Sequence, residues 1–441
     1  MDVKISIIGG GSYSWMRILF LNFLSNPYFK GYTICLMDVV PEALDDLYEL
    51  CLRYNQLKPE MKIKITKTTD LNVALFGAAY VIVSISHGHL EAELEDHRIG
   101  RKYGFWNVKG SESGVAGASR TFRHVPETLR IARMMEKVCP NAMLLNVTNP
   151  LTAITRAVNK YTSIKCYGFC HGVINHLGIL LPFFGANGFE GVDFNVGGID
   201  HCSWLLDVRY RGQNALQIMR DKGMIEMARQ GKTLVASEDP FSGRENQRLR
   251  FLIWDIIGYL PACSDEHCVE FFGQIMGDET KRKYYKVSYD RIKERISAVR
   301  KAKEKIKMLL NGKDNLRIVR NSEIIDRFIA ALNGEGEFID VLNAPNVGQI
   351  QNLPEESIVE SRCVVNATGV HPVMVGALPR AIETIVNPLL AREELYMEAA
   401  AEDSFEKLRA ALSMDPLVND FRVIDDVARD IIEYNRRYRK E

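Results

Sequence analysis

The feature that most constrains the fold is a series of short apolar or β-branched segments that alternate with segments of helical spacing. The first, residues 4–8, ends abruptly at Gly9-Gly10-Gly11, and a helical pattern follows at 15–24. The other strand-type segments are 32–37, 62–66, 80–85, 143–147 and 167–169. Strands that are apolar on both faces and separated by helices are typical of a parallel sheet covered on both sides. We therefore predict an α/β fold with a doubly wound, Rossmann-type parallel sheet.

The chain is too long for this sheet alone. Its 441 residues exceed the size of one compact core, so we expect two domains. We place the first domain at residues 1–190 and a second, α+β domain at 191–441. The signals for the second domain are strand patterns at 194–198 and 204–208 and helical patterns at 215–230 and 289–310. No internal repeat or low-complexity linker separates the halves, so they are expected to share an interface.

The charge balance excludes several classes of partner. Lys and Arg together number 56, as do Asp and Glu, so the formal net charge is zero. This balance argues against nucleic acid or an anionic membrane as partner, and no uncharged apolar run reaches the ~20 residues that span a bilayer. The nine cysteines are an odd number without framework spacing, which is typical of reduced thiols. Because the first residues also lack the pattern of a secretory leader, we expect a cytoplasmic protein.

The turn after the first strand has the pattern of a dinucleotide site. Gly9 and Gly11, with Ser12 in the same turn, would let the backbone approach a pyrophosphate at the N-terminus of the following helix. Asp38 ends the second strand, where a carboxylate accepts hydrogen bonds from ribose hydroxyls and repels a 2′-phosphate. Ser14 replaces the usual third glycine. NAD is therefore the predicted cofactor; the alternative is a plain strand–helix turn whose glycines serve geometry alone.

Polar residues also follow three later strand-type segments. Asn149 follows one, Cys170-His171 the next, and Asp200-His201 closes a third. Thiolate and imidazole are suitable ligands for a divalent transition metal. No CxxC or HExxH pattern is present, however, and buried cysteines and hydrogen-bonded histidines are common. From spacing alone, a structural role for these residues is an equally good explanation.

Taken together, these segments resemble glycoside hydrolase family 4, the NAD- and manganese-dependent glycosidases. The resemblance covers nearly the whole chain, in segments 8–12, 36–38, 96–98, 102–104, 148–150, 168–172, 198–201, 343–350, 352–354 and 359–360. The Cys-His-Gly segment and the later Asp-His are specific to it, whereas lactate and malate dehydrogenases share only the glycine turn. The resemblance implies a lactate/malate dehydrogenase-like architecture in which residues 1–190 bind NAD. Residues 191–441 would then bind the sugar and form a homodimer or homotetramer.

The chemistry that the resemblance implies differs from the two-carboxylate scheme of most glycosidases. NAD would take hydride from C3 of the sugar, a base would remove the acidified C2 proton, and the C1–O bond would break by elimination. Water would add to the enone and NADH would return the hydride. Mn²⁺ on O2 and O3 would act as a Lewis acid.

Residue roles carried over from the family are as follows. Cys170 and His201 match the manganese ligands, and Asn149 matches an asparagine that contacts sugar hydroxyls. His171 occupies the position of the general acid. These four residues define the site that the resemblance implies.

The base that removes the C2 proton is the most open assignment. Asp265 matches the position of an aspartate near the metal in the glucosidases, which makes it a candidate base. Tyr259 or a metal-bound hydroxide is the alternative. Asp265 could equally cap a helix, because a helical pattern follows it.

The resemblance also bears on the sugar. Members acting on 6-phosphosugars usually carry Asn or Asp after the metal cysteine and Pro two positions later; His171 and Val173 stand there instead. We therefore expect an unphosphorylated α-glycoside, an α-galacturonide or other α-uronide or an α-galactoside, with an α-glucoside as the alternative. Gly172 stands where galacturonidases carry Glu. A uronate would need a cation, for which Arg120 and Arg380 are candidates, although isolated arginines are more often in surface ion pairs.

Two further hypotheses remain open from sequence. One is a dehydrogenase of the lactate/malate type, in which NADH would accumulate, and the other is a dinucleotide-sensing binding protein without hydrolytic activity. Residues 111–120 have the pattern of a glycine-containing loop that lines the cleft between cofactor and sugar, with a plain surface loop as the alternative.

Overall fold

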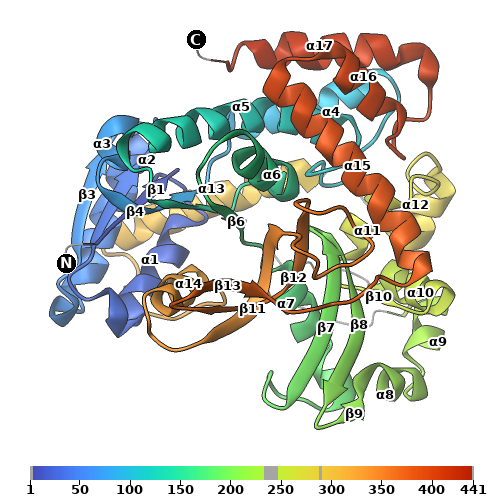
Figure 1. The fold of residues 1–441 in the computed structure, drawn as a ribbon, viewed down its shortest axis with the longest axis horizontal. Coiled ribbons are helices and arrows are strands. Elements are labelled where there is room, and N and C mark those ends of the chain that lie inside the picture. The colour runs from blue at the N-terminus through green and yellow to red at the C-terminus, as the bar shows by residue number, and fades with distance from the viewer. Residues whose placement is uncertain (1–2, 233–246, 288–290, 440–441) are drawn as a thin grey trace.

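The computed structural model describes residues 3–232, 247–287 and 291–439, and a single mixed sheet runs through it (Figure 1). Six parallel strands follow the order β3-β2-β1-β4-β5-β6, and antiparallel strands continue the sheet as β11-β12-β7-β8-β10, with β13 on β12 and β9 on β8. The strands are β1 (Lys4–Ile8), β2 (Thr33–Met37), β3 (Lys64–Thr68), β4 (Ala78–Val83), β5 (Met143–Asn146), β6 (Cys166–Gly168), β7 (Val192–Ile199), β8 (Cys202–Tyr210), β9 (Gln213–Asn214), β10 (Leu260–Pro261), β11 (Phe338–Pro345), β12 (Ile358–Asn366) and β13 (Gly369–Pro372).

Helices cover both faces of the parallel part. The α-helices are α1 (Met16–Ser25), α2 (Pro41–Gln56), α3 (Leu71–Leu75), α4 (His89–Lys102), α5 (Gly114–Val138), α6 (Leu151–Tyr161), α7 (Gly172–Gly178), α8 (Ala215–Asp221), α9 (Met224–Arg229), α10 (Arg248–Ile257), α11 (Asp265–Phe271), α12 (Glu279–Tyr285), α13 (Arg291–Leu310), α14 (Ile325–Leu332), α15 (Arg380–Glu402), α16 (Phe405–Ser413) and α17 (Ile424–Arg436). Short 3-10 turns lie at Pro27–Phe29, Pro59–Met61, Leu181–Phe184 and Phe421–Val423. The predicted doubly wound α/β architecture is confirmed.

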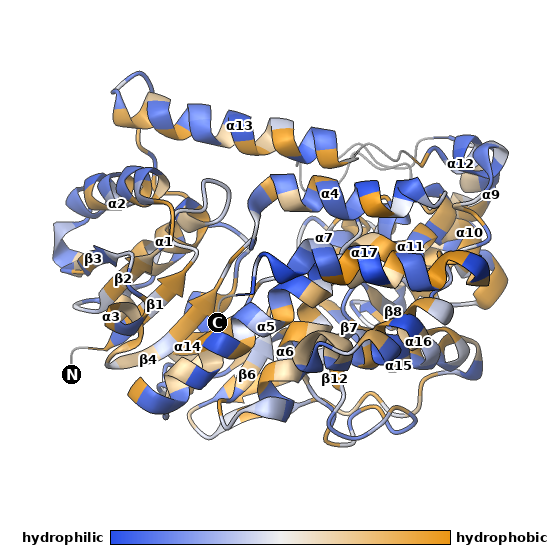
Figure 2. Ribbon diagram, turned by 90° about the horizontal axis from the view of Figure 1, so that it is seen from above, coloured by the Kyte–Doolittle hydropathy of each residue, from blue (hydrophilic) through white to orange (hydrophobic). Residues whose placement is uncertain are grey.

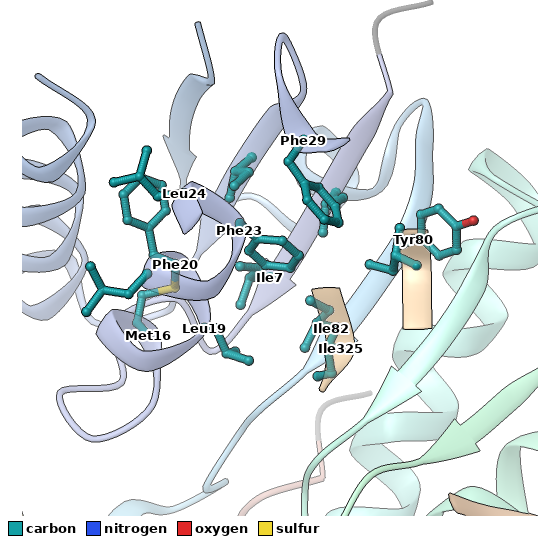
Figure 3. Close-up of a cluster of buried hydrophobic side chains, with 14 of the residues drawn as sticks. Ile7, Met16, Leu19, Phe20, Phe23, Leu24, Phe29, Tyr80, Ile82 and Ile325 are labelled. Atoms are coloured by element: carbon teal, nitrogen blue, oxygen red, sulfur yellow. The ribbon is translucent and has the colours of Figure 1, made fainter. Parts of the chain in front are cut away.

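Alternation along the parallel strands divides the core between two layers. Ile7 and Ile82 face α1 in one layer, where they pack with Phe20, Phe23 and Phe29 (Figure 3). The next residues on the same strands face the opposite layer, under α3, α5 and α6. Because both faces are buried, these strands are continuous apolar runs rather than alternating ones.

The two halves are continuous rather than separate. Gly168 of β6 pairs with Asn343 of β11, which joins the parallel and antiparallel parts of the sheet. Ile325 and Phe328 of α14 lie in the same apolar cluster as Ile7. The predicted shared interface is therefore present, and a segment from the second half completes the core of the first.

Two local predictions need correction. The helix predicted at 215–230 is two helices, α8 and α9, because Gly223 between them has a left-handed backbone (φ +73°). Most of the loop predicted at 111–120 is helical, since α5 begins at Gly114. Small residues and glycines there allow close packing, and a Cβ on Gly117 would lie 2.5 Å from the backbone carbon of Glu112.

The charged helix predicted at 289–310 is α13, which lies along the outside of the molecule next to α2 and α4 (Figure 2). Its buried residues are Ile292, Ile306 and Leu309, and most of its other side chains are polar. Among the helices of the described ranges, none is both long and apolar enough to cross a membrane.

Candidate active site

The strand order reverses between β1 and β4, and at this point open α/β sheets bind ligands beyond the carboxyl ends of their strands. The glycine turn lies here. The NH groups of Gly9 and Gly10 both donate to the carbonyl oxygen of Met37, at 2.9 and 2.8 Å. Gly9 has φ +96°, and a Cβ on it would lie 2.0 Å from the carbonyl oxygen of Ser84. Directly after β1, the backbone is therefore packed so closely against Ser84 that only glycine fits at position 9.

Asp38 is tied directly to this turn. One carboxylate oxygen accepts the NH of Gly11 at 2.8 Å, and the other accepts the NH of Val40 at 3.0 Å. Each oxygen retains a further lone pair, and the side chain is only half-buried. Ser12 belongs to the same turn, and its hydroxyl accepts the NH of Trp15 at 3.3 Å just before α1 begins. The four residues predicted for the cofactor are thus brought together at one strand-to-helix turn.

Cys170 and His201 are also brought together. Cys170 follows β6, whereas His201 lies in the turn between β7 and β8, and the Sγ and Nε2 atoms are 3.6 Å apart. Asp200 completes a group of three whose ligand atoms all lie within 4.8 Å of one another. Two segments 31 positions apart in the chain thus supply a thiol, an imidazole and a carboxylate to one point.

The second nitrogen of His201 faces acidic groups. Its Nδ1 lies 3.0 Å from Oε1 of Glu112 and 3.5 Å from Oδ2 of Asp200. Glu112 belongs to the segment that precedes α5. A carboxylate at Nδ1 favours a proton there and leaves Nε2, on the side of Cys170, as the electron-pair donor.

Buried acidic groups lie around Cys170 and His201. Asp200 is fully buried, and neither of its carboxylate oxygens has a hydrogen-bond partner in the described part of the chain. Burial raises its pKa, although the adjacent His201 opposes the rise. Glu360 of β12 lies close by, where burial and the charge of Asp200 raise its pKa. A cluster of this kind is typical of a site completed by a cation.

A second imidazole lies against His201. The ring of His267, in α11, stacks on that of His201 with a centroid distance of 3.9 Å. Glu112, His201 and His267 form a second group of possible metal ligands. Burial lowers the pKa of His267, which keeps the ring neutral and able to act as a ligand.

His171 lies between this group and the glycine turn. It precedes α7, and its Nδ1 is 2.9 Å from Oε1 of Glu323. Its ring is 5.5 Å from that of Trp15, which precedes α1. The predicted general acid is therefore close to the predicted cofactor turn and has a carboxylate partner.

Asn149 is held through its backbone by His124 of α5. The Nε2 of His124 lies 3.2 Å from the NH of His87, which can only donate, so Nδ1 carries the ring proton. This Nδ1 donates to the carbonyl oxygen of Asn149 at 2.7 Å. The loops after β4 and β5 are thus fixed to each other through one buried imidazole.

Asp265 does not face this group. Its two oxygens accept the NH groups of Leu249 and Arg250, both at 2.9 Å, in the first turn of α10. The geometry favours the alternative, in which Asp265 caps a helix. The helix that it caps is α10, whereas Asp265 itself is the first residue of α11. Tyr259 packs against the apolar cluster that contains Trp204 and Cys268.

The two candidate cations differ. Arg380 is 84% exposed and pairs with Glu383, so it is a surface residue. Arg120 is buried and pairs with Glu93 at 2.7 Å. Arg120 therefore remains the candidate within the site.

Several site residues had no predicted role. These are Glu112, Asp200, His267, Glu323 and Glu360. Glu112 lies in the segment predicted to line the cleft, His267 is two positions after Asp265, and Asp200 and Glu360 belong to segments shared with the family. All of these residues except Glu323 therefore had a local sequence signal. Their convergence on one site, however, depends on contacts across the sheet.

Comparison with known families agrees with this geometry. The pattern of the family described as "Family 4 glycosyl hydrolase" matches residues 4–180, and that of the "Family 4 glycosyl hydrolase C-terminal domain" matches residues 196–418. The chain therefore belongs to glycoside hydrolase family 4, and it is a glycoside hydrolase.

Characterised relatives match along the whole chain. An α-galactosidase of Bacillus subtilis is 28% identical over 94% of this chain and 93% of its own length. An α-galacturonidase of Thermoanaerobacterium saccharolyticum is 26% identical over 99% of this chain and 96% of its own length. These relatives share the family and differ in the sugar they act on.

Solved structures agree on the fold. A Bacillus subtilis protein described as a glucosidase has a TM-score of 0.89 at 26% identity and covers 98% of this chain and 99% of its own. A 6-phospho-α-glucosidase from gut microorganisms, solved with NAD and Mn²⁺, has a TM-score of 0.84 at 18% identity, covering 99% of each chain. Malate dehydrogenase of Plasmodium falciparum has a TM-score of 0.52 at 13% identity, covering 92% of this chain and all of its own. The expected dehydrogenase-like architecture is confirmed.

Proposed function

We propose that this glycoside hydrolase cleaves an unphosphorylated α-galactoside or α-galacturonide and uses NAD and Mn²⁺. The observation that carries the proposal is the approach of Cys170 to His201 at the edge of the sheet where the glycine turn lies. Neither residue has a counterpart in a simple dehydrogenase of this architecture. We also propose that the chain forms a homodimer or homotetramer in the cytoplasm, as expected from the family.

The donor set fits Mn²⁺. Cys170 and His201 offer sulfur and nitrogen, and buried Asp200 offers oxygens that accept no hydrogen bond from the described residues. A mixed set of this kind accepts first-row divalent metals. Glu112 would hold His201 in the ligating tautomer from behind.

The glycine turn fits NAD. Gly9 and Gly11 keep the turn free of side chains, and Asp38 has acceptor capacity left for ribose hydroxyls. The negative charge of Asp38 would disfavour the 2′-phosphate of NADP. Ser12 and the N-terminus of α1 would bind the pyrophosphate of NAD.

When bound, NAD would supply a hydride acceptor for C3 of the sugar and Mn²⁺ would supply a Lewis acid for its hydroxyls. The residues of the chain would orient the sugar and move protons. Asn149, fixed through His124, would hold sugar hydroxyls, and His171 would protonate the departing oxygen while Glu323 keeps its ring oriented. Asp265 has no part in this proposal, because its oxygens serve α10.

Two observations support the choice of sugar. His171 and Val173 differ from the Asn or Asp and Pro that usually accompany 6-phosphosugar specificity in this family. The α-galactosidase and α-galacturonidase relatives match nearly the whole chain, and an α-glucosidase of Erwinia rhapontici does so as well, which keeps an α-glucoside as the alternative.

The test is an activity panel. The full chain, with NAD, Mn²⁺ and a thiol reductant, is assayed against aryl α-galactosides, α-galacturonides, α-glucosides and their 6-phosphates, while ultraviolet absorbance of the reduced nicotinamide reports NADH. We expect release of the aryl group from a galacto-configured, unphosphorylated substrate without accumulation of NADH. A preference for 6-phosphates would overturn the substrate, and stoichiometric NADH formation would favour the dehydrogenase alternative.

A further inference from the structure

His201 lies at the tip of a tight turn. Only Asp200 and His201 separate β7 from β8, and the backbone of His201 is left-handed, with φ +61°. A residue with a side chain adopts this conformation at a cost and keeps it where the surrounding structure holds it. An imidazole binds a metal along a lone pair in the ring plane, so the orientation of the ring decides whether Nε2 meets the ion. The contacts around this ring are therefore part of the metal site.

Two of these contacts lie at the edges of the ring. Oε1 of Glu112 is 3.0 Å from Nδ1, and Sγ of Cys170 is 3.6 Å from Nε2. The Nδ1 atom of His201 has no aligned hydrogen-bond partner among the described residues. Contacts at two opposite edges leave the tilt of the ring plane free, so a contact on the face of the ring is needed to fix it.

The face contact comes from His267 in α11. The two rings stack with their centroids 3.9 Å apart and their planes 26° apart. Nδ1 of His267 is buried and has no hydrogen-bond partner among the described residues. Because buried polar atoms are normally hydrogen-bonded, an imidazole whose Nδ1 lacks such a bond needs another reason to be there. The stack on His201 provides that reason.

Apolar packing fixes α11 beside the turn between β7 and β8. Cys268 and Val269 of this helix lie in the same buried cluster as Ile199, at the end of β7, and Trp204 of β8. The helix that carries His267 and the turn that carries His201 therefore share one core. The stacked rings are held from both sides by rigid elements rather than by a loop.

The polar side of α11 is tied to the segment that leads into Glu112. Oε1 of Glu270 accepts the backbone NH groups of residues 108–110, at distances between 2.7 and 3.1 Å. Oε2 of Glu266 pairs with the ammonium of Lys109 at 2.7 Å. One short helix thus restrains both the carboxylate at the edge of the His201 ring and the imidazole on its face.

His267 could instead be a metal ligand, because Glu112, His201 and His267 form a group of possible ligands. The lone pairs of an imidazole lie in the plane of its ring. Two stacked rings whose planes are only 26° apart do not both point at an ion one bond length away. The stacked geometry therefore favours support of His201 over ligation by His267.

We propose that His267 is a positioning residue for the metal site: by stacking on His201 it fixes the ring plane so that Nε2 points at the ion beside Cys170. The inference rests on the proposed function, since the ion is the Mn²⁺ proposed there. Metal-bound imidazoles depend on outer contacts for their orientation, and the loss of such a contact typically lowers metal affinity ~10–100-fold.

The experiment compares H267A and H267F with the wild type. The Kd for Mn²⁺ is measured by calorimetric titration of the full chain in the presence of NAD. We expect binding to be about 10-fold weaker in H267A, because the ring plane of His201 is no longer fixed. In H267F we expect a Kd within about 3-fold of the wild type, because a phenyl ring can stack but cannot bind a metal. H371A, at an exposed histidine on β13, is the control and should bind Mn²⁺ like the wild type.

A second readout reports the geometry at the ion itself. Co²⁺ is added in place of Mn²⁺, because its visible absorption depends on the ligands and their arrangement. We expect the absorption bands to change in H267A and to return to their wild-type positions in H267F. Unchanged bands in H267A would mean that His201 keeps its orientation without the stack, which would overturn the inference.

The binding data separate the remaining outcomes. Equal Mn²⁺ affinity in H267A and the wild type would show that the stack is packing only, and equal losses in H267A and H267F would make His267 a ligand; either result overturns the inference. If the wild type still binds Mn²⁺ and cleaves a glycoside of the panel, the proposed function stands in both cases. If the wild type neither binds Mn²⁺ nor cleaves any substrate, the proposed function fails and the inference fails with it.

Thermal unfolding monitored by circular dichroism checks that each variant is folded. H267F removes a buried nitrogen that has no hydrogen-bond partner among the described residues, so we expect it to fold. If H267A does not fold, H267L takes its place, because leucine fills the volume without offering a ring to stack. The same loss of about 10-fold in Mn²⁺ affinity is expected there. Wild-type affinity in a folded H267L protein would contradict the role of the stack.

Discussion

Cys170 has buried, acidic surroundings that suit a metal ligand better than a free thiol. Burial raises the pKa of its thiol, and the nearby Asp200 and Glu360 raise it further. Its Sγ nevertheless faces Nε2 of His201 and accepts the NH of Gly172 at 3.3 Å. A thiol surrounded by acids and an imidazole is a poor nucleophile but a suitable metal ligand, because a divalent cation compensates all of these charges at once.

The first prediction concerns this thiol. In C170S we expect the affinity for Mn²⁺, measured by calorimetric titration in the presence of NAD, to fall about 100-fold or more, because a weakly acidic hydroxyl replaces the sulfur ligand. C139S, at a buried cysteine after α5, is the control and should bind Mn²⁺ like the wild type. Equal affinities in C170S and wild type would remove Cys170 from the metal site.

The second prediction concerns Gly9. In G9A the new Cβ would meet the carbonyl oxygen of Ser84, and the backbone would also keep an unfavourable φ. We expect the free energy of unfolding to fall by about 3 kcal/mol and NAD binding to be lost. Urea denaturation and NAD titration measure the two effects.

Gly77 provides the matched control, since it has φ +70° but no neighbouring atom within 4 Å of the position that a Cβ would take. G77A should therefore cost only about 1 kcal/mol and leave NAD binding intact. If G9A and G77A lost similar amounts of unfolding free energy, backbone strain alone, without the close approach to Ser84, would explain why glycine stands at position 9.

At the scale of elements, the strands of the parallel part and the β7–β8 pair were predicted from the sequence. The strands β9 to β13 and several helices were not. Runs such as 80–85 and 143–147 are typical of buried parallel strands because they are short, continuous and apolar, and both faces of such strands are covered. The start of α5 was not predictable, because glycines and serines at 111–120 are also loop signals and only packing against Glu112 distinguishes the two cases. The role of Asp265 was open for a similar reason: its partner helix begins 17 positions earlier, beyond the reach of a local capping pattern.

The third prediction tests that role. In D265N one carboxylate oxygen becomes an amide group that cannot accept, so α10 loses one of its two caps. We expect the free energy of unfolding to fall by about 1–2 kcal/mol, while the turnover rate of the folded enzyme falls less than ~10-fold. Denaturation and steady-state kinetics measure these effects together. If turnover in a folded D265N protein instead fell by about three orders of magnitude, Asp265 would be restored as the catalytic base.

At the scale of the whole molecule, one sheet and its shared core bring together residues from distant parts of the chain. The predicted boundary at 190/191 falls just before β7, yet α14 and β11 pack with the first half. The metal pair could be assigned from sequence only through the family resemblance, because the spacing of Cys170 and His201 is not a local motif. The convergence of Glu112 and His267 on that pair depends on the antiparallel extension of the sheet, which strand patterns alone do not specify.

This packing also buries histidines, and the fourth prediction follows from that. Burial, aided by the charge of Arg120, lowers the pKa of His97 from 6.5 to about 4. The unfolded chain then binds a proton that the folded chain refuses, so stability is complete above pH 6.5 and is lost as the pH falls from there towards 4. By about pH 5 the loss from His97 is on the order of 2 kcal/mol.

The measurement is the change in the free energy of unfolding between about pH 7.5 and about pH 5, compared between H97Q and wild type. The change should be smaller in H97Q by roughly that 2 kcal/mol, whatever the variant's stability at neutral pH. An identical change in the two proteins would mean that His97 titrates normally in the folded state.

Our central proposal, which follows from the family resemblance, is that hydrolysis proceeds by elimination across C1 and C2 of the sugar. It can be tested by running the reaction in D₂O. The full chain is incubated with NAD, Mn²⁺, a reductant and the best aryl α-glycoside from the panel, and the released sugar is analysed by mass spectrometry and proton NMR. We predict one deuterium at C2 of the product and no net NADH. A product that retains its original proton at C2 would contradict the account, because the C1–O bond would then have been cleaved without deprotonation of the neighbouring carbon.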